Sequence, residues 1–296
     1  ELYFIQQLAE YVNDADKNIF LITTLHQDFN SYAFELTKSQ RNEWSKVKGR
    51  LKEIGFNEPV EQLLFLASER IKNIPSKLTA NKNFSKLFKA IKASKSFPLR
   101  DYFNEDIAEK LLPFDILAAA ILTLGLQKYG QNERSLFSFI ESNDPLGIQN
   151  DKFSNNYFSI SSVFDYLVNN FSILGTRYNP DFTQWAAINI SIERIEGIFE
   201  EDIDKAISLI KTIGLLNIFS AASARIDNDF LEAYSKVSLG IKNPISVLEK
   251  LERWKIIRDG RHSQKYILVE GTDLDIEMAI DEAGNLVEKV TNVLDY

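Results

Sequence analysis

The chain has 296 residues, of which 45% are hydrophobic and 26% are charged, an ordinary globular composition whose length predicts about two domains. It has no cysteine and only two histidines, which excludes disulfides and thiolate metal sites, argues against a histidine-based zinc site, and fits a reducing cytoplasm. The net charge of −8 argues against a whole-surface nucleic-acid binder, and no apolar run approaches the roughly 18–20 residues that would span a membrane.

Residues 1–57 have the pattern of an α/β fragment. Apolar residues recur at helical spacing from residue 2 to residue 12. Residues 19–23 are continuously apolar and rich in β-branched side chains, which predicts a parallel strand buried on both faces. A mostly helical stretch and a short strand at residues 52–56 follow. Because so few strands cannot make a stable sheet, we expect this segment to be the end of a larger α/β domain.

Residues 58–150 predict a helical domain. Pro59 and Glu61 mark a helix start, since proline suits the first helical position and an acidic side chain suits the first turn. Residues 113–126 are apolar nearly all round, which predicts the buried centre of a helical bundle.

Residues 151–217 predict a helical connector, with helices at 162–171, 182–198 and 201–213. In residues 218–275, a helix at 229–237 precedes Asn243-Pro244, an N-cap and first-turn pair. The helix that this pair begins carries Ile245, Leu248 and Leu251 inward. Two strands flanking Asp259-Gly260 complete the order helix, helix, strand, turn, strand, which is that of a winged helix. Residues 276–296 are expected to be a C-terminal helix or tail.

The order of motifs in the first half resembles a known family. An apolar strand ends in Thr23-Thr24-Leu25-His26-Gln27, a basic turn contains Gly49-Arg50, and Pro59-Val-Glu-Gln62 begins a helix. This order resembles the second half of the core of bacterial AAA+/STAND-type P-loop ATPases, and the string from Gly130 to Leu136, GQNERSL, resembles a block that recurs in them. None of the 12 glycines precedes a lysine, so the sequence contains no Walker A loop.

The resemblance covers roughly residues 1–142 and 200–275. It implies a mainly α chain: a remnant of an α/β ATPase core, then a helical lid and a C-terminal winged helix. It also implies an N-terminal ATPase half as a missing partner, and ATP and Mg²⁺ as cofactors of the intact protein. We expect neither to bind this chain alone, because the phosphate-cradling loop is missing.

The resemblance assigns candidate nucleotide residues, each with a structural alternative. Thr23 or Thr24 would orient water at the γ-phosphate, or would only cap the strand. Arg50 would be an arginine finger that reaches a neighbouring protomer, or part of a solvated basic turn. Arg134 would be the lid arginine that contacts nucleotide, or would make a salt bridge within the lid.

The wing is the candidate DNA site. Arg258, Arg261, His262 and Lys265 cluster around Gly260, are expected to be exposed, and could straddle a phosphate backbone. The preceding helix presents a mixed face with two carboxylates, which would repel phosphate. A protein-contact wing therefore remains open, and the aromatic residues are interpreted as core packing.

The sequence thus predicts the lid and winged-helix portion of an ATPase that couples nucleotide state to DNA or a partner, in a homo-oligomer and in a process such as phage defence. The alternative is a non-enzymatic winged-helix adaptor or transcription regulator.

Overall fold

The computed structural model is mainly helical and has one small sheet. It describes residues 2–14, 16–24, 38–52, 54, 59–71, 74, 78, 82–97, 99, 103–130, 135–149, 153, 156–176, 179–260 and 264–269.

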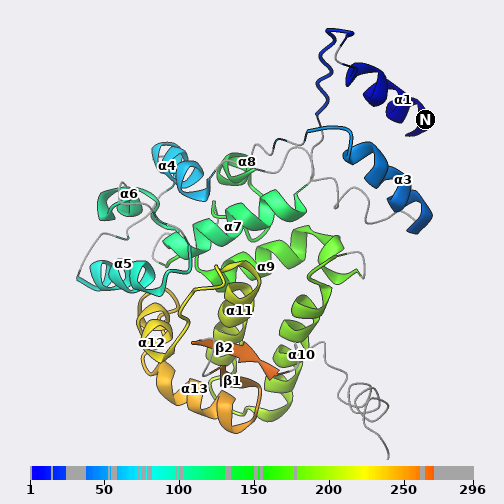
Figure 1. The fold of residues 1–296 in the computed structure, drawn as a ribbon. Helices are drawn as coiled ribbons and strands as arrows, with labels where there is room; N and C mark the ends of the chain where they lie inside the picture. Colours follow the sequence, from blue (N-terminus) through cyan, green and yellow to red (C-terminus); the bar gives the residue numbers. More distant parts are fainter. Residues whose placement is uncertain are drawn as a thin grey trace, which may run out of the picture.

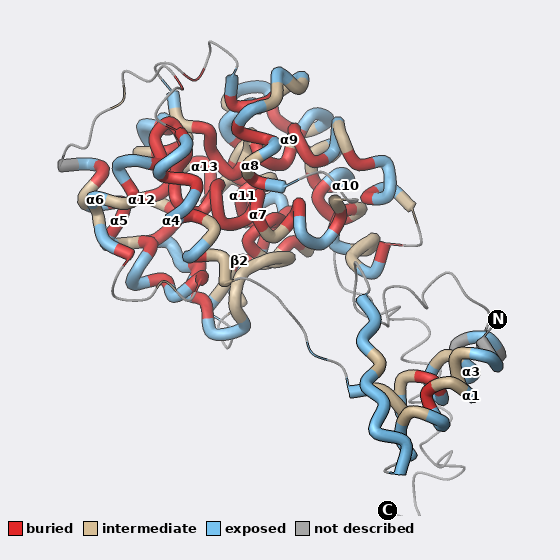
Figure 2. Tube along the Cα trace, turned by 90° about the horizontal axis from the view of Figure 1, so that it is seen from above, coloured by how far each residue is buried: buried red, intermediate tan, exposed pale blue. Residues whose placement is uncertain are grey.

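The first two described helices, α1 (Leu2–Val12) and α3 (Lys38–Lys48), pack on each other. Among the residues from 2 to 54 whose burial the structure describes, Ala9 and Val47 are the only buried hydrophobic ones. Figures 1 and 2 show the two helices standing apart from the other described elements. The described residues from 2 to 54 are called the N-terminal unit below.

The prediction of a strand at residues 19–23 is wrong for this chain. These residues run without regular secondary structure, and Phe20 and Ile22 are 90% and 77% exposed. A strand forms only when a neighbour pairs with its backbone, and none of the other described residues hydrogen-bonds to residues 18–24. Of the second predicted strand, Lys52 and Ile54 are described and belong to no strand.

The body, residues 59–269, contains the other described elements. Its helices before the sheet are α4 (Val60–Arg70), α5 (Lys82–Ser94), α6 (Glu105–Lys110), α7 (Ile116–Tyr129), α8 (Leu136–Glu141), α9 (Ile160–Asn170), η3 (Ser172–Gly175), α10 (Phe182–Ile198), α11 (Ile203–Phe219), α12 (Asn228–Val237) and α13 (Pro244–Arg253). One hydrophobic cluster extends from Leu64 to Leu268. It passes through all three segments predicted as lid, connector and winged helix.

Helix α7 lies at the centre of the body, as its apolar sequence predicts. It contacts α4, α8, α9 and α11, and most of its side chains are buried. Asp115 caps its first turn by accepting a hydrogen bond from the N–H of Ala118 at 2.8 Å, the usual role of an N-cap carboxylate.

Helices α10 and α11 approach closely at Gly214. A Cβ at this position would lie 2.4 Å from Cγ1 of Ile188 on α10. That is far inside van der Waals contact, so the absence of a side chain at Gly214 sets how near the two helices can lie. Helix α11 also packs on α9, and α10 and α11 both contact β2, near which they lie in Figure 1.

The sheet consists of β1 (Ile257–Gly260) and β2 (Lys265–Leu268), paired antiparallel. Ile226 pairs with the other edge of β2: its N–H donates to the Gln264 carbonyl at 2.9 Å, and its carbonyl accepts from the Tyr266 N–H at 3.1 Å. The chain therefore runs α11, a one-residue bridge, α12, α13, β1, β2.

Local sequence signals locate these last elements well. Pro244 is at the start of α13, and α10 has the predicted bounds. Two details differ. Ile245 is 38% exposed, and the inner face of α13 is formed by Val247, Leu248 and Leu251.

Candidate functional site

The two faces of the hairpin lie in different surroundings. Because side chains alternate along a strand, Ile257, Tyr266 and Leu268 share one face, and all three are buried. The Tyr266 hydroxyl donates to the side-chain oxygen of Asn228 on α12 at 3.0 Å. Arg258 and Lys265 lie on the opposite face of the hairpin.

Lys265 is not the exposed cation that the sequence predicts. Its ammonium donates to the Ala221 carbonyl at 2.7 Å and to the Ser220 hydroxyl at 3.2 Å, just after α11 ends. Partial burial lowers the pKa of this lysine below its usual value. The correction has a simple cause: β2 turns Lys265 toward the two residues just after α11, where its ammonium finds two oxygen acceptors.

Arg258 is exposed, as predicted, and Arg253 and Lys255 lie near it in sequence and are exposed too. Between them, Trp254 is 50% exposed, and its carbonyl accepts a hydrogen bond from Arg194 of α10 at 3.1 Å. Sequence reasoning missed Trp254, because it follows the inner stripe of α13 at helical spacing. The helix ends at Arg253, so the indole leaves that stripe.

Helix α13, the second helix of the predicted winged helix, offers little to DNA. Its exposed side chains recur at Ile245, Glu249 and Arg253, with the carboxylate in the middle. Lys250 is directed toward Asp202, at 3.4 Å. One apolar, one acidic and one basic side chain form a face that fits a protein better than a phosphate backbone.

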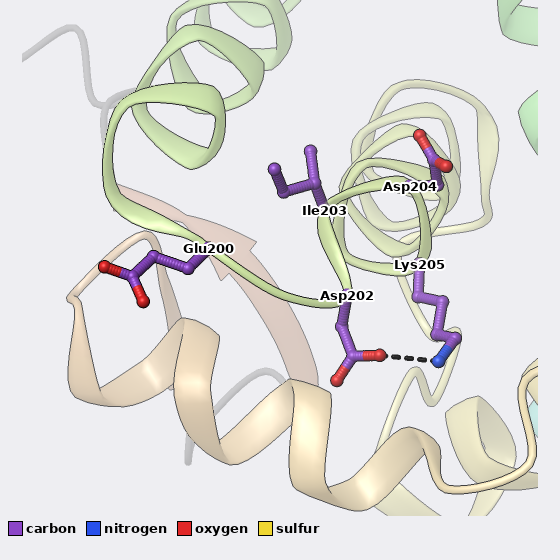
Figure 3. Close-up of a pocket in the computed structure, with 5 residues that line it drawn as sticks. All are labelled: Glu200, Asp202, Ile203, Asp204 and Lys205. Carbon is purple, nitrogen blue, oxygen red and sulfur yellow. Dashed lines mark hydrogen bonds and ion pairs between the residues drawn. The ribbon is translucent and has the colours of Figure 1, made fainter.

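A shallow open hollow of about 290 Å³ lies beside this helix, around the start of α11 (Figure 3). Asp202 has a left-handed backbone, with φ of 63°, and pairs with Lys205 at 2.5 Å. The hydrogen bond from Lys205 lowers the pKa of Asp202. Glu200 and Asp204 point away from Asp202 in Figure 3. The acidic side chains around the hollow therefore point in different directions. The charged pair in it, Asp202 with Lys205, belongs to the start of α11.

A buried polar junction joins α12 to the starts of α7 and α9. The Tyr234 hydroxyl on α12 donates to Asp115 Oδ2 at 2.6 Å and accepts from the N–H of Ile160, at the start of α9, at 2.9 Å. Asp115 is 1% exposed, and burial raises the pKa of its carboxyl to about 6. Around this junction, the loop before α12 donates from the N–H of Ala221 to the Ser96 carbonyl, at 2.9 Å. These bonds fix α12 and the loop before it against α7, α9 and the segment that follows α5.

The structure describes all three predicted catalytic residues, and they lie in the N-terminal unit. Thr23 and Thr24 are exposed and lie in no strand. Arg50 pairs with Glu10 at 2.7 Å and donates to the Lys46 carbonyl at 2.7 Å, so its guanidinium ties α1 to the end of α3. The Asn13 side chain donates to the Arg50 carbonyl, at 2.6 Å. The roles of Thr23, Thr24 and Arg50 toward ATP and Mg²⁺ in an intact protein stay predictions.

Three other predicted site residues, Arg134, Arg261 and His262, lie outside the described residues, and so does the predicted C-terminal segment 276–296. The stretches of chain that the structure describes contain no cluster of three or more histidine, aspartate or glutamate side chains suited to a metal ion. No helix in those stretches is long and apolar enough to cross a membrane.

Comparison with known proteins gives no family: no family model, curated protein or solved structure matches this chain.

Proposed function

We propose that this chain is the helical lid and winged-helix portion of a bacterial AAA+/STAND-type ATPase, and that its winged helix engages a protein partner. The observation that carries the proposal is the order α11, Ile226, α12, α13, β1, β2, with Ile226 bonded to the free edge of β2. Two helices followed by a hairpin whose outer edge is completed by a residue before the first of them is the layout of a winged helix.

The attachment of α12 to the body supports a coupling role. Tyr234, Asp115 and the start of α9 form one buried hydrogen-bonded set, and α12 packs extensively on α5. A domain held by buried polar bonds and a shared core moves with its support, because breaking such bonds leaves unpaired polar groups. A displacement of the lid would therefore be passed to the winged helix.

The distribution of charge supports a protein partner. Lys265 and Lys250 are engaged within the molecule, and Glu249 interrupts the exposed face of α13. Exposed Trp254 and Arg253 are of the residue types that dominate protein interfaces. DNA binding through the described wing residues would depend on Arg258 almost alone.

Two experiments test the proposal. Calorimetry of this chain with ATP should show no micromolar binding; micromolar affinity that ADP competes for would refute the lid interpretation. Reading the coding frame upstream of Glu1 should reveal Walker A and B motifs in frame. Their absence would leave the alternative, a winged-helix adaptor without ATPase activity, which the pairing of Arg50 with Glu10 favours.

The preference for protein over DNA is tested with a labelled duplex. Anisotropy should show only weak binding, with a log K against log salt slope of about −1, because one or two phosphate contacts remain. A slope near −3, which Arg258→Ala reduces by about one, would restore DNA as the partner of the wing.

A further inference from the structure

Helix α5 presents a row of positive charge on a chain whose net charge is −8. Its inner side, which includes Phe84, Leu87 and Ile91, is buried, and the helix packs on α12 (Figure 1). Exposed lysines recur every three residues along its outer side and just beyond its end: Lys86, Lys89, Lys92 and Lys95. These four residues are called the lysine stripe below.

No described carboxylate pairs with a lysine of the stripe. Glu105, on the neighbouring α6, accepts a hydrogen bond from Ser85 of α5 instead. Exposed Arg225 extends the positive surface, because its N–H donates to the Ser94 carbonyl at the end of α5, at 2.7 Å. Like charges so close together repel one another, so an acidic segment laid along them would relieve the repulsion.

Strand β2 lies close to the end of α5. Arg225 is bonded to Ser94, and the next residue, Ile226, accepts from the Tyr266 N–H at 3.1 Å. The described chain ends three residues after Tyr266, at Val269, which is about 10 Å of strand. Chain that continues from Val269 therefore starts within reach of the positive surface.

The sequence that follows Val269 is strongly acidic. Residues 270–282 lie outside the described part of the chain, and they contain no lysine, arginine or histidine and six carboxylates: Glu270, Asp273, Asp275, Glu277, Asp281 and Glu282. Thirteen residues can span about 45 Å, whereas the stripe from Lys86 to Lys95 is about 14 Å long. These residues, the acidic segment, are thus numerous enough to reach the stripe and to lie along it.

We propose that the acidic segment, residues 270–282, binds along the lysine stripe of the same chain. Its attachment at Val269 gives it an effective concentration of about a millimolar at the stripe, which favours it over an acidic segment of another protein. The bound segment would cover the stripe, in keeping with the weak duplex binding expected above. The contact needs no ATPase half, so it does not depend on the proposed function.

Zero-length cross-linking of the full chain tests this contact. A carbodiimide joins a carboxylate to a lysine only where the two side chains touch. In dilute protein, mass spectrometry of the monomer band should show the carboxylates of residues 273–282 linked mainly to the lysine stripe. Lys255 is the matched control, because it is exposed and the carbonyl of the next residue, Ile256, accepts from the Val269 N–H at 3.0 Å. It lies beside the start of the segment and should still give fewer links than the stripe.

Charge reversal shows whether the links depend on complementary charge. Lys89→Glu combined with Lys92→Glu should lower cross-linking at Lys86 roughly tenfold, because attraction for the acidic segment becomes repulsion. Adding Asp275→Lys and Glu277→Lys should produce links between the introduced glutamates and the introduced lysines. Links mainly to the control lysine, cross-linked dimers in place of linked monomers, an unchanged yield in the double variant, or no new links in the fourfold variant would overturn the proposal.

Discussion

Apolar sequence patterns lead to different structures in the N-terminal unit and in the body. In the body, apolar periodicity produces helices that share one core from Leu64 to Leu268. In the N-terminal unit, the apolar run at residues 19–23 stays exposed and irregular. Helices make their backbone hydrogen bonds within themselves, whereas a strand depends on a neighbour. The difference teaches that the body has an extensive core of its own, whereas the described part of the N-terminal unit buries little apolar surface.

The largest expected effect compares two phenylalanines. Phe158→Ala, at a fully buried position in the body, should lower the free energy of unfolding by about 3–5 kcal/mol, because it leaves a cavity. Phe20→Ala, at a 90% exposed position, should change it by less than about 0.5 kcal/mol. Urea unfolding of dilute protein measures both. Similar losses would mean that the N-terminal unit belongs to the same core.

The second prediction concerns pH and the buried junction in the body. Folding raises the pKa of Asp115 from 3.8 to about 6, so the folded state binds the proton more tightly. The contribution of Asp115 to stability is therefore greatest below about pH 3.8 and is lost as pH rises to about 6. The loss is about 3 kcal/mol in total.

Asp115→Asn should remove this dependence. Across pH 4–6, the stability of wild type relative to the variant should fall as pH rises. A difference that is constant with pH, or that rises, would show that the carboxyl is not buried against Tyr234.

A third comparison uses two glycines on neighbouring helices. Gly214→Ala should destabilise the body by about 1–3 kcal/mol, because the new methyl group would overlap Ile188. Gly197→Ala, on α10, has no atom within 4 Å of the new Cβ and should stabilise the helix by about 0.5–1 kcal/mol. Thermal unfolding of both variants measures the two changes in stability. Equal changes in melting temperature would contradict the close approach of α10 and α11.

The smallest expected effect is the difference in stability between alanine substitutions of two basic residues of the hairpin, Lys265 and Arg258. Lys265→Ala should cost about 1 kcal/mol of stability, because it removes the ammonium bonds to the Ala221 carbonyl and the Ser220 hydroxyl. Arg258→Ala should stay within about 0.5 kcal/mol, as expected of an exposed side chain. Denaturant unfolding measures both losses of stability. A larger loss for Arg258→Ala than for Lys265→Ala would mean that Lys265 is exposed, as the sequence predicts for a DNA-binding residue.

These contrasts also show what the sequence could predict. The bounds of α10 and the start of α13 at Pro244 were predictable, since helix signals are local. The burial of α7 was predictable from its uninterrupted apolar sequence. Residues 19–23 have a strand pattern, but the pattern does not say whether a partner strand is present.

The candidate site was harder to predict. Strand alternation places Lys265 on a face of the hairpin, yet only the fold shows that the end of α11 covers that face. Trp254 continues an inner stripe by spacing, and only the helix end after Arg253 exposes it. Arg50 is a basic turn residue in the sequence, and its partner Glu10 lies forty residues earlier on another helix.

Amide hydrogen exchange on dilute, monomeric protein tests the central claim most directly. The account predicts that residues 19–24 exchange at nearly the rate of an unfolded chain, while amides in α7 and α11 are slowed by at least about 10³-fold, because they open only with the body. Strong protection of residues 19–24 in the monomer, or rapid exchange in α7 and α11, would contradict the contrast between an N-terminal unit that buries little apolar surface and a body with an extensive core of its own.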